Sequence, residues 1–370
     1  MRLSKAEGEK SPANLHRSLT LELVRVTERA AIAAAEWRGK GDEKAADDAA
    51  VRAMKAELDR VAISGRVVIG EGEEHECDEL FIGQPVGAGE GPEVDIAVDP
   101  LEGVTLCAKN QPDSIVVLAM AERGGLLNVA RNVYMHKIAI GAEYPAGTVN
   151  IEWSATENVR ALAGAKGVPL SEITAIVLDR PRHAGLIEEL RTTGVAVKLI
   201  SDGDIAGVIH AVNTEDTGID IYLGSGSAPE GVLAAAALRC IGGQMQGKLI
   251  LDSPAKRERA HAMGITDPNR IYDVTELAAG DVPVAATGVT DGTLLGRRPP
   301  APRLGQKPTP SLCAAGARPS AGSRPSTPGE RLQLTPQPPH PPFSLGLDPR
   351  PPATRHKRRV ILGSSPRKQR

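Results

Sequence analysis

The chain has 370 residues, of which 41% are hydrophobic and 24% are charged. These are ordinary proportions for a folded protein, and the length allows one large or two ordinary domains with a substantial core. Aromatic residues make up only 2%, which argues against a protein that stacks single-stranded nucleic acid on aromatic rings. The net charge of −2 combines about −15 in residues 1–296 with about +13 in residues 297–370.

Neither a membrane span nor a disulfide framework is expected. The longest apolar runs, such as residues 115–121, have about seven residues, whereas a spanning helix needs about 20. The polar N-terminus lacks the apolar middle of a signal peptide. The cysteines are scattered and form no CxxC pair: Cys77, Cys107, Cys240 and Cys313. The simplest location is therefore a reducing cytoplasm.

Two amphipathic helices are expected first, after a flexible extension over residues 1–17. The spacing of apolar residues predicts a helix over residues 18–37, and Gly39 and Gly41 are expected to end it. Its inward face comprises Leu19, Leu23, Val26, Ala30, Ala33 and Trp37. A second helix is predicted from about Ala45 to Val61, and its inward residues are Val51, Met54 and Leu58.

Strands and helices then alternate. Strands are predicted at residues 66–69, at 94–98, ending at Asp99-Pro100, and at 115–121. From residue 174 the pattern predicts a strand at 174–179, a helix from His183, a strand at 195–200, a helix from Asp204, a strand at 218–223, a glycine-rich loop at 224–231, and a helix that starts near Glu230. This alternation predicts an α/β layered architecture.

The last 74 residues differ from the rest in composition. They contain 15 Lys and Arg, two acidic residues and 17 of the 29 prolines. Residues 297–370 are therefore predicted to be a disordered basic tail, because such a segment buries too little apolar surface to offset its ordering entropy. A basic tail can bind nucleic acid non-specifically, but a solvated tail without a partner is the favoured interpretation.

Acidic residues follow the predicted strands. Glu71 ends one strand, Asp99 ends another, and Glu102 follows Asp99 at i+3, so that one turn can direct both carboxylates to one point. Asp47 and Asp48 lie at the start of the second helix, and Glu230 at the start of a later one. For each acid taken alone, the favoured interpretation is a helix cap or a solvated residue. Several carboxylates that converge require cations, and all-oxygen ligands select Mg²⁺ or Mn²⁺.

Candidate anion-binding residues lie in the second half. Arg180-Pro181-Arg182 follows a strand, and two guanidinium groups there can grip phosphate oxygens. The glycine-rich segment 224–231 leads into a helix, whose free N–H groups favour anions. It matches neither a dinucleotide fingerprint, because position 229 is proline, nor a P-loop. Acids and anion binders together predict a phosphate ester held against metal ions.

In this order the motifs resemble those of the class II fructose-1,6-bisphosphatases, from about Leu19 to Leu295. The resemblance rests on GDEKAADDAAV (41–51), VVIGEGEE (67–74), GEGPEVDIAVDPLEG (89–103), VYMHKIAIG (133–141), LDRPRHAGLI (178–187), ISDGDIA (200–206), APEGVLAAAAL (228–238) and AATGVTDGTLL (285–295). It implies the αβαβα sandwich of the sugar and inositol phosphatases, with a metal-binding part over about 18–170 and a substrate-binding part over about 171–296.

The resemblance also implies an activity. A cytoplasmic homo-oligomer would hydrolyse the 1-phosphate of fructose 1,6-bisphosphate to fructose 6-phosphate, a reaction of gluconeogenesis, and some members also accept sedoheptulose 1,7-bisphosphate. By motif position Asp47 and Glu71 match the ligands of one Mn²⁺ or Mg²⁺, and Asp99, Glu102 and Glu230 match those of another. The positions that match the substrate-binding residues are Glu102, Gly103, Val104, Tyr134, Arg180, Pro181, Arg182, Asp202, Gly203, Asp204 and Ser227.

The chain departs from the family at three places. The family reads DPLEGT, and that threonine helps to activate the attacking water, whereas this chain has Val104; Thr105 is the adjacent hydroxyl and, with Asp99 and Glu102, a candidate catalytic residue. Ser227 replaces a glycine, and the basic tail replaces the family's ordered C-terminal continuation. Three hypotheses stay open: an active metal-dependent sugar bisphosphatase, a homologue that binds the bisphosphate without turnover, and a protein that binds nucleic acid through its tail.

Overall fold

The computed structural model describes residues 13–130, 132–294 and 311–315. Its first sheet has the strand order β12-β11-β4-β3-β1-β2 and its second has the order β10-β9-β5-β8-β6-β7. The first sheet consists of β1 (Ser64–Ile69), β2 (Pro85–Val86), β3 (Glu93–Glu102), β4 (Ile115–Glu122), β11 (Pro283–Gly288) and β12 (Ser311–Ala315). The second consists of β5 (Tyr134–Ile140), β6 (Thr174–Leu178), β7 (Ala196–Ile200), β8 (Ile221–Ser227), β9 (Gln244–Ile250) and β10 (Ile271–Asp273).

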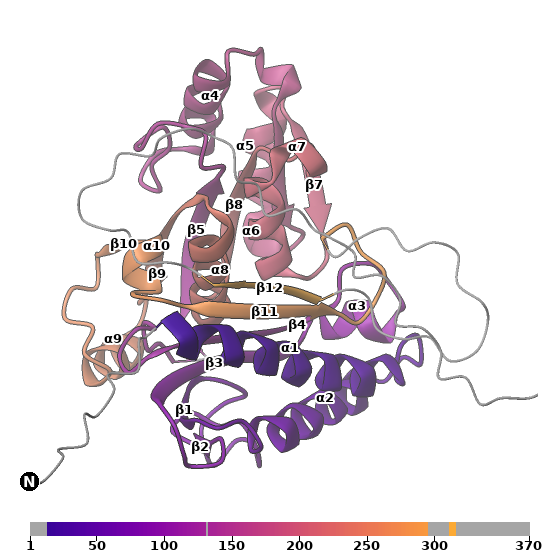
Figure 1. Cartoon of the computed structure of the whole chain (residues 1–370). Helices are drawn as coiled ribbons and strands as arrows, with labels where there is room; N and C mark the ends of the chain where they lie inside the picture. Colours follow the sequence, from indigo (N-terminus) through magenta and orange to yellow (C-terminus); the bar gives the residue numbers. More distant parts are fainter. Residues whose placement is uncertain (1–12, 131, 295–310, 316–370) are drawn as a thin grey trace, which may run out of the picture. The chain divides into compact units, whose positions relative to one another are not determined.

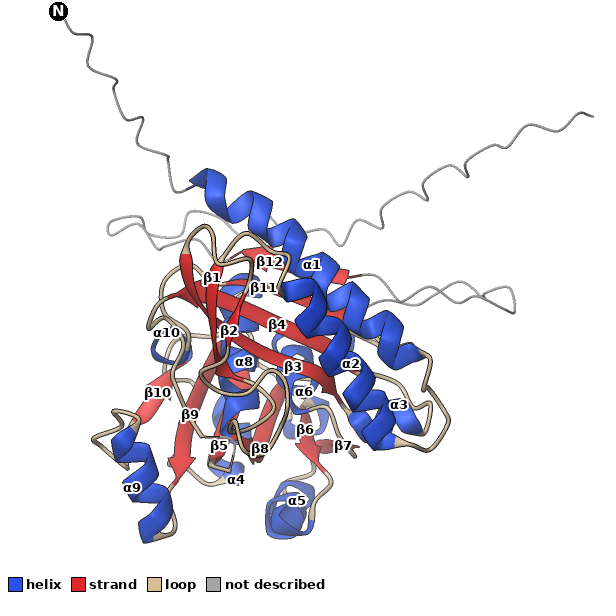
Figure 2. Cartoon of the chain, turned by 90° about the horizontal axis from the view of Figure 1, so that it is seen from below, coloured by secondary structure: helices blue, strands red, loops and turns tan. Residues whose placement is uncertain are grey.

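Helices cover both faces of each sheet (Figures 1 and 2). The longer helices are α1 (Ala13–Ala35), α2 (Glu43–Leu58), α4 (Ala155–Lys166), α5 (Ala184–Thr192), α6 (Asp204–Val212), α8 (Ala228–Ile241) and α9 (Pro254–Ala262). The short ones are α3 (Val104–Ala108), α7 (Thr214–Thr217) and α10 (Val274–Leu277), with 3-10 turns at Leu170–Glu172 and Pro181–His183.

Three hydrophobic clusters establish the order of the layers. Alternate residues of β4 point to opposite faces: Val116 and Leu118 pack against α1 and α2, while Val117 and Ala119 pack against α6 and α8. The cluster around α6 and α8 also includes Met135 of the second sheet. The far face of that sheet packs against α4 and α5. The order is thus helix, sheet, helix, sheet, helix, and the predicted αβαβα sandwich is confirmed.

The two helices predicted at the start of the chain are confirmed as α1 and α2. In α1 the residues Leu19, Leu23, Val26 and Ala30 are buried as expected, whereas Ala33 and Trp37 are only half-buried and Trp37 lies beyond the end of the helix. Gly39 adopts a left-handed φ of 72° just after the helix. Met54 and Leu58 of α2 are also fully buried. Because their 3.6-residue periodicity is long and regular, these elements were the easiest to infer.

Three predictions about strands and loops are wrong. Asp99-Pro100 does not end β3, which continues to Glu102 through a shift of register that accommodates the proline. Residues 224–227 are not a loop: they form the second half of β8 and pair with residues 134–137 of β5. Within the predicted disordered tail, Ser311–Ala315 form β12 on the edge of β11, where they satisfy backbone groups that would otherwise be open.

Residues 13–17 of the predicted flexible extension belong to α1, which begins at Ala13. The other predicted domain limits stay predictions, because residues 1–12 and most of residues 297–370 lie outside the described part of the chain. In the described part, no helix combines the length and the hydropathy needed to cross a membrane.

Candidate metal centre

Six acidic side chains line one cavity of about 280 Å³, hereafter the acid cavity. They are Asp47, Glu71, Asp99, Glu102, Asp202 and Glu230. Among the described residues that line it, none is Lys, Arg or His. Two like charges 4 Å apart repel by about 4 kcal/mol at an effective dielectric constant near 20. The five acids expected to meet around metal ions therefore do meet, at a place where the lining supplies no compensating charge.

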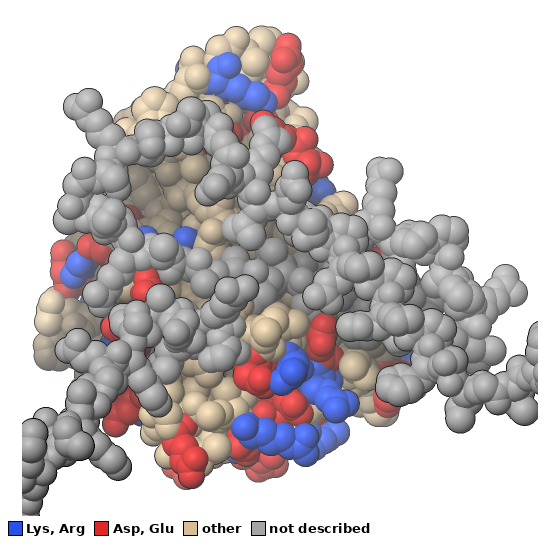
Figure 3. Space-filling view, in the orientation of Figure 1, with Lys and Arg blue, Asp and Glu red and all other residues tan. Residues whose placement is uncertain are grey.

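Acids elsewhere on the surface differ in this respect. On α1 and α2, Glu22 pairs with Arg25, Asp48 with Lys44 and Asp59 with Lys55. Figure 3 shows Lys and Arg interspersed with Asp and Glu over this part of the molecule. The acid cavity thus differs from these positions on α1 and α2, where the acids have basic partners.

The irregular end of β3 brings Asp99 and Glu102 together. Residues three apart on a regular strand point to opposite faces. Asp99 pairs with Val117 and Glu102 with Ile115, so β3 has one more residue than β4 in this stretch. Such a bulge turns both carboxylates to the same side. The sequence predicted that a turn would direct both carboxylates to one point, whereas in the structure a bulge in β3 does so.

Other elements contribute the remaining acids. Glu71 follows the end of β1, where the chain crosses closely under the backbone of Leu80. Asp47 comes from α2. Glu230 lies in the first turn of α8, where the unpaired N–H groups of the helix favour a negative charge.

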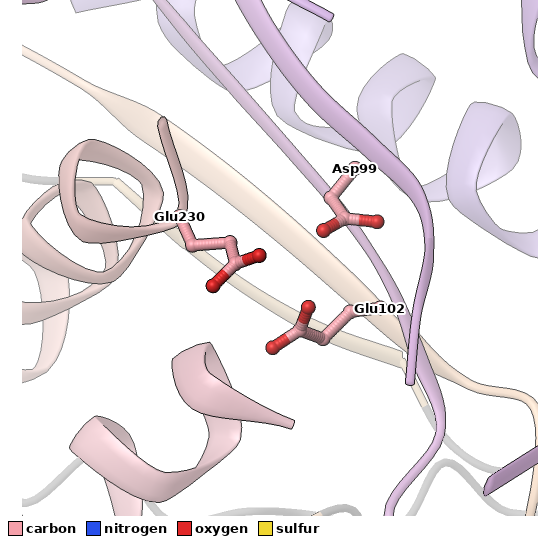
Figure 4. A group of neighbouring side chains, drawn as sticks. All are labelled: Asp99, Glu102 and Glu230. Atoms are coloured by element: carbon pink, nitrogen blue, oxygen red, sulfur yellow. The ribbon is translucent and has the colours of Figure 1, made fainter. Parts of the chain in front are cut away.

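Asp99, Glu102 and Glu230 form the tightest group. Each offers a carboxylate oxygen, and these oxygens lie within 4.8 Å of one another. Figure 4 shows the three carboxylates turned toward each other from β3 and α8. The three residues offer only carboxylate oxygens, and oxygen ligands this close together are suited to a hard divalent cation. They therefore fit the Mg²⁺ or Mn²⁺ that the sequence predicts.

The electrostatics of this group agree with a cation site. Burial is the first cause that raises the pKa of all three carboxyl groups well above their usual range. Neighbouring carboxylates raise them further: Glu71 and Glu230 act on Asp99, Asp99 acts on Glu102, and Glu102 acts on Glu230. Without a cation these groups favour protonation, and a bound divalent ion reverses that preference.

The start of α6 holds part of the site in place. The N–H of Ile205 donates a hydrogen bond of 2.8 Å to Glu102 Oε1. Gly203, just before the helix, adopts a left-handed φ of 88°, which a residue with a side chain rarely adopts. Asp202 precedes it, lines the acid cavity and accepts a hydrogen bond from the N–H of Thr105.

The remaining predicted site residues separate into two groups. Gly103, Val104 and Ser227 line the acid cavity, whereas Thr105 is not among its lining residues. Tyr134, Arg180, Pro181 and Arg182 lie outside the lining. Arg182 stacks over the Tyr134 ring at 5.1 Å and donates to the carbonyl of Ser225, and Arg180 forms an ion pair of 3.5 Å with Asp202. Of the second group, Arg180 is connected to the acid cavity through Asp202.

Asp204 is placed differently from the expectation. By motif position it matches a substrate-binding residue of the family, but in the structure the residue is buried. Its two oxygens accept hydrogen bonds from Lys137 Nζ and from the Tyr222 hydroxyl. Nothing in the sequence indicates either donor, because a lysine and a tyrosine within predicted strands have the pattern of ordinary sheet residues.

A glycine makes the approach to Glu71 possible. A Cβ on Gly70 would lie 2.0 Å from the carbonyl oxygen of Leu80, whereas one on Gly185, within α5, would meet nothing within 4 Å. Gly70→Ala is therefore expected to lower the free energy of unfolding by roughly 3 kcal/mol, and Gly185→Ala to raise it by about 0.5–1 kcal/mol. Urea unfolding of both variants checks this, and equal stability of the two would contradict the close crossing.

Comparison with known proteins finds one matching family model and relatives that carry the corresponding name. The family model described as bacterial fructose-1,6-bisphosphatase, glpX-encoded, matches residues 17–307. A D-fructose 1,6-bisphosphatase class 2/sedoheptulose 1,7-bisphosphatase from Prochlorococcus marinus (strain MIT 9303) is 46% identical over 294 residues, which cover 76% of this chain and 87% of the relative. A protein of the same name from Parasynechococcus marenigrum (strain WH8102) is 45% identical with the same coverage.

Among solved structures, CysQ from Bacteroides thetaiotaomicron, a bacterial member of the inositol monophosphatase family, matches with a TM-score of 0.31 and 16% identity. The match covers 55% of this chain and 79% of that chain. At that TM-score it adds nothing to the layer order described above.

Proposed function

The chain belongs to the glpX-type family of bacterial fructose-1,6-bisphosphatases, and on this basis we propose that it hydrolyses the 1-phosphate of fructose 1,6-bisphosphate with the help of Mn²⁺ or Mg²⁺. The names of the relatives extend the proposal to sedoheptulose 1,7-bisphosphate. The observation that carries it is the convergence of five acids from α2, β1, β3 and α8 in the acid cavity.

We assign Asp47 and Glu71 to one cation and Asp99, Glu102 and Glu230 to another. Such ions, when bound, neutralise phosphoryl oxygens and lower the pKa of a water molecule. The protein supplies the rest: the bulge of β3 orients two carboxylates, and Ile205 N–H holds Glu102. Because Asp202 joins the acid cavity to Arg180, the distal phosphate would lie on the arginine side.

A second candidate function is binding of the bisphosphate without turnover. The observation that favours it is the position of Val104, a residue of the acid-cavity lining that offers no hydroxyl. Release of phosphate from fructose 1,6-bisphosphate with Mn²⁺, compared with an EDTA-treated sample, distinguishes the two. Metal-dependent turnover supports the phosphatase; tight binding of the sugar bisphosphate with no turnover supports the second candidate.

Metal binding is expected to stabilise the fold increasingly as the pH rises. The pKa values of Asp99, Glu102 and Glu230 are higher in the folded protein than in the unfolded chain. At a pH between those two values, the folded protein therefore binds more protons than the unfolded chain. Without metal, the contribution of these groups to stability is therefore lost as the pH rises. A cation removes this loss, and at 100 times its Kd it adds about 2.7 kcal/mol.

Thermal unfolding between pH 5 and 8, with and without Mn²⁺, measures this effect. We expect the Mn²⁺-induced rise in Tm to be larger at pH 8 than at pH 5. A shift that is independent of pH, or none at all, would contradict the metal assignment.

A cytoplasmic location and homo-oligomeric assembly belong to the same proposal. The first rests on the scattered cysteines of the sequence, which form no CxxC pair and suggest no disulfide framework. The second is supported only by family resemblance, and sedimentation equilibrium tests it.

A further inference from the structure

A buried ion pair lies directly behind Glu230. Lys137 of β5 and Asp204 of α6 form it, and their side chains are 1% and 4% exposed. Lys137 Nζ donates to Asp204 Oδ2 and also to the carbonyl oxygen of Ser227 at 2.9 Å. Ser227 ends β8 immediately before α8, so the ammonium group fixes the corner from which Glu230 projects.

Two glycines leave room for this pair. A Cβ on Gly226 would lie 2.2 Å from Asp204 Oδ2 and 3.2 Å from Lys137 Nζ. A Cβ on Gly231, the residue after Glu230, would lie 2.7 Å from Met135 Sδ and in ordinary contact, at 3.4 Å, with Lys137 Cδ. The lysine stem therefore passes under the first turn of α8, and the absence of a side chain at Gly226 leaves room for its ion pair with Asp204.

Asp204 is the link between the lysine and the acid cavity. Its negative charge is one of the causes that raise the pKa of the neighbouring Glu230 carboxyl group, after burial and the charge of Glu102. Its other oxygen accepts from the hydroxyl of Tyr222, whose ring is fully buried. Asp204 is thus drawn away from the cavity by two donors, while Glu230 faces Asp99 and Glu102.

We propose that Lys137 is a positioning residue for the metal centre: it holds Asp204 back, so that Glu230 and not Asp204 presents its carboxylate to the cation. This inference rests on the proposed metal site. It assigns a positioning role to a lysine that is not among the residues lining the acid cavity. A freed Asp204 would compete with Glu230 for the same space and displace it by like-charge repulsion. Residues that orient metal ligands in this manner are typically worth 10–100-fold in metal affinity.

Lys137→Met tests the proposal, because methionine keeps most of the apolar stem and removes the ammonium group. We expect the Mn²⁺ dissociation constant, measured by EPR titration of free Mn²⁺, to rise roughly 10–100-fold. Lys166→Met is the matched control: Lys166 forms an ion pair of 2.6 Å with buried Asp220, in the same half of the fold but outside the acid cavity. It is expected to lower Tm without changing the Mn²⁺ dissociation constant.

The double variant Lys137→Met/Asp204→Asn shows whether Lys137 acts through Asp204. It removes both charges of the pair, so it is expected to fold even if the single variant does not, and to bind Mn²⁺ within about threefold of the unmodified protein. Unchanged or tighter Mn²⁺ binding by Lys137→Met would overturn the proposal, as would a double variant as weak as the single one. Failure of the unmodified protein to bind Mn²⁺ would instead overturn the proposed metal site.

Discussion

Glu102→Gln is expected to reduce Mn²⁺-dependent phosphate release by roughly 10³-fold or more, because an ion that stabilises the transition state by several kcal/mol loses its central ligand. Glu102 is the most buried of the three clustered acids at 5% exposure, and its oxygen faces both Asp99 and Glu230. Glutamine preserves the size of the side chain and its hydrogen bond from Ile205, so the change removes charge with little change of shape.

The phosphate-release assay with saturating Mn²⁺ measures this effect. Asp48→Asn is the matched control, since Asp48 is adjacent to Asp47 on α2 but pairs with Lys44 and does not line the acid cavity. We expect less than a threefold effect there. Equal losses in the two variants, or a fully active Glu102→Gln enzyme, would contradict the proposed centre.

Glu102→Gln also has a consequence for stability in the opposite direction. Neutralising one of several buried like charges relieves repulsion, so the EDTA-treated variant should unfold at a higher temperature than the unmodified protein. The Mn²⁺-induced increase in Tm should then be largely lost. Loss of activity caused by misfolding would instead lower the Tm under both conditions.

Val104→Thr is expected to raise kcat on the order of 10²-fold or more, with little change in KM. Val104 is the first residue of α3 and belongs to the lining of the acid cavity, so a hydroxyl at this position would lie beside the carboxylates that are proposed to hold the cations. Groups that orient or activate water typically contribute about 10²–10⁴-fold to the rate. Threonine and valine have nearly the same shape, so the fold should be unaffected.

Steady-state kinetics of three proteins decide this point. Val104→Ala, which offers no hydroxyl, is the control and should show no gain over the unmodified protein. If the unmodified protein turns over as fast as Val104→Thr, position 104 does not limit the reaction. A variant Thr105→Val then shows whether the neighbouring hydroxyl, outside the cavity lining, has taken over the task.

The sequence alone was sufficient for the acids and for the main helices. Asp47, Glu71, Asp99, Glu102 and Glu230 follow from their motifs, and the structure places all five in one cavity. Helices α1 and α2 follow from their periodicity, because a long apolar repeat of 3.6 residues is typical of an amphipathic helix and does not fit a strand.

The tertiary structure decided what depends on partners distant in the chain. Residues 224–227 are rich in glycine and read locally as a loop, but pairing with β5 makes them a strand, and Gly226 leaves space for Asp204 and Lys137. Asp204 resembled a substrate ligand, yet Lys137, 67 residues earlier, holds it inside the protein. Local composition therefore determined which residues are candidates for chemistry. Contacts between strands and helices decide which of these residues line the cavity and which only position the lining residues. These contacts cannot be inferred from any local sequence pattern.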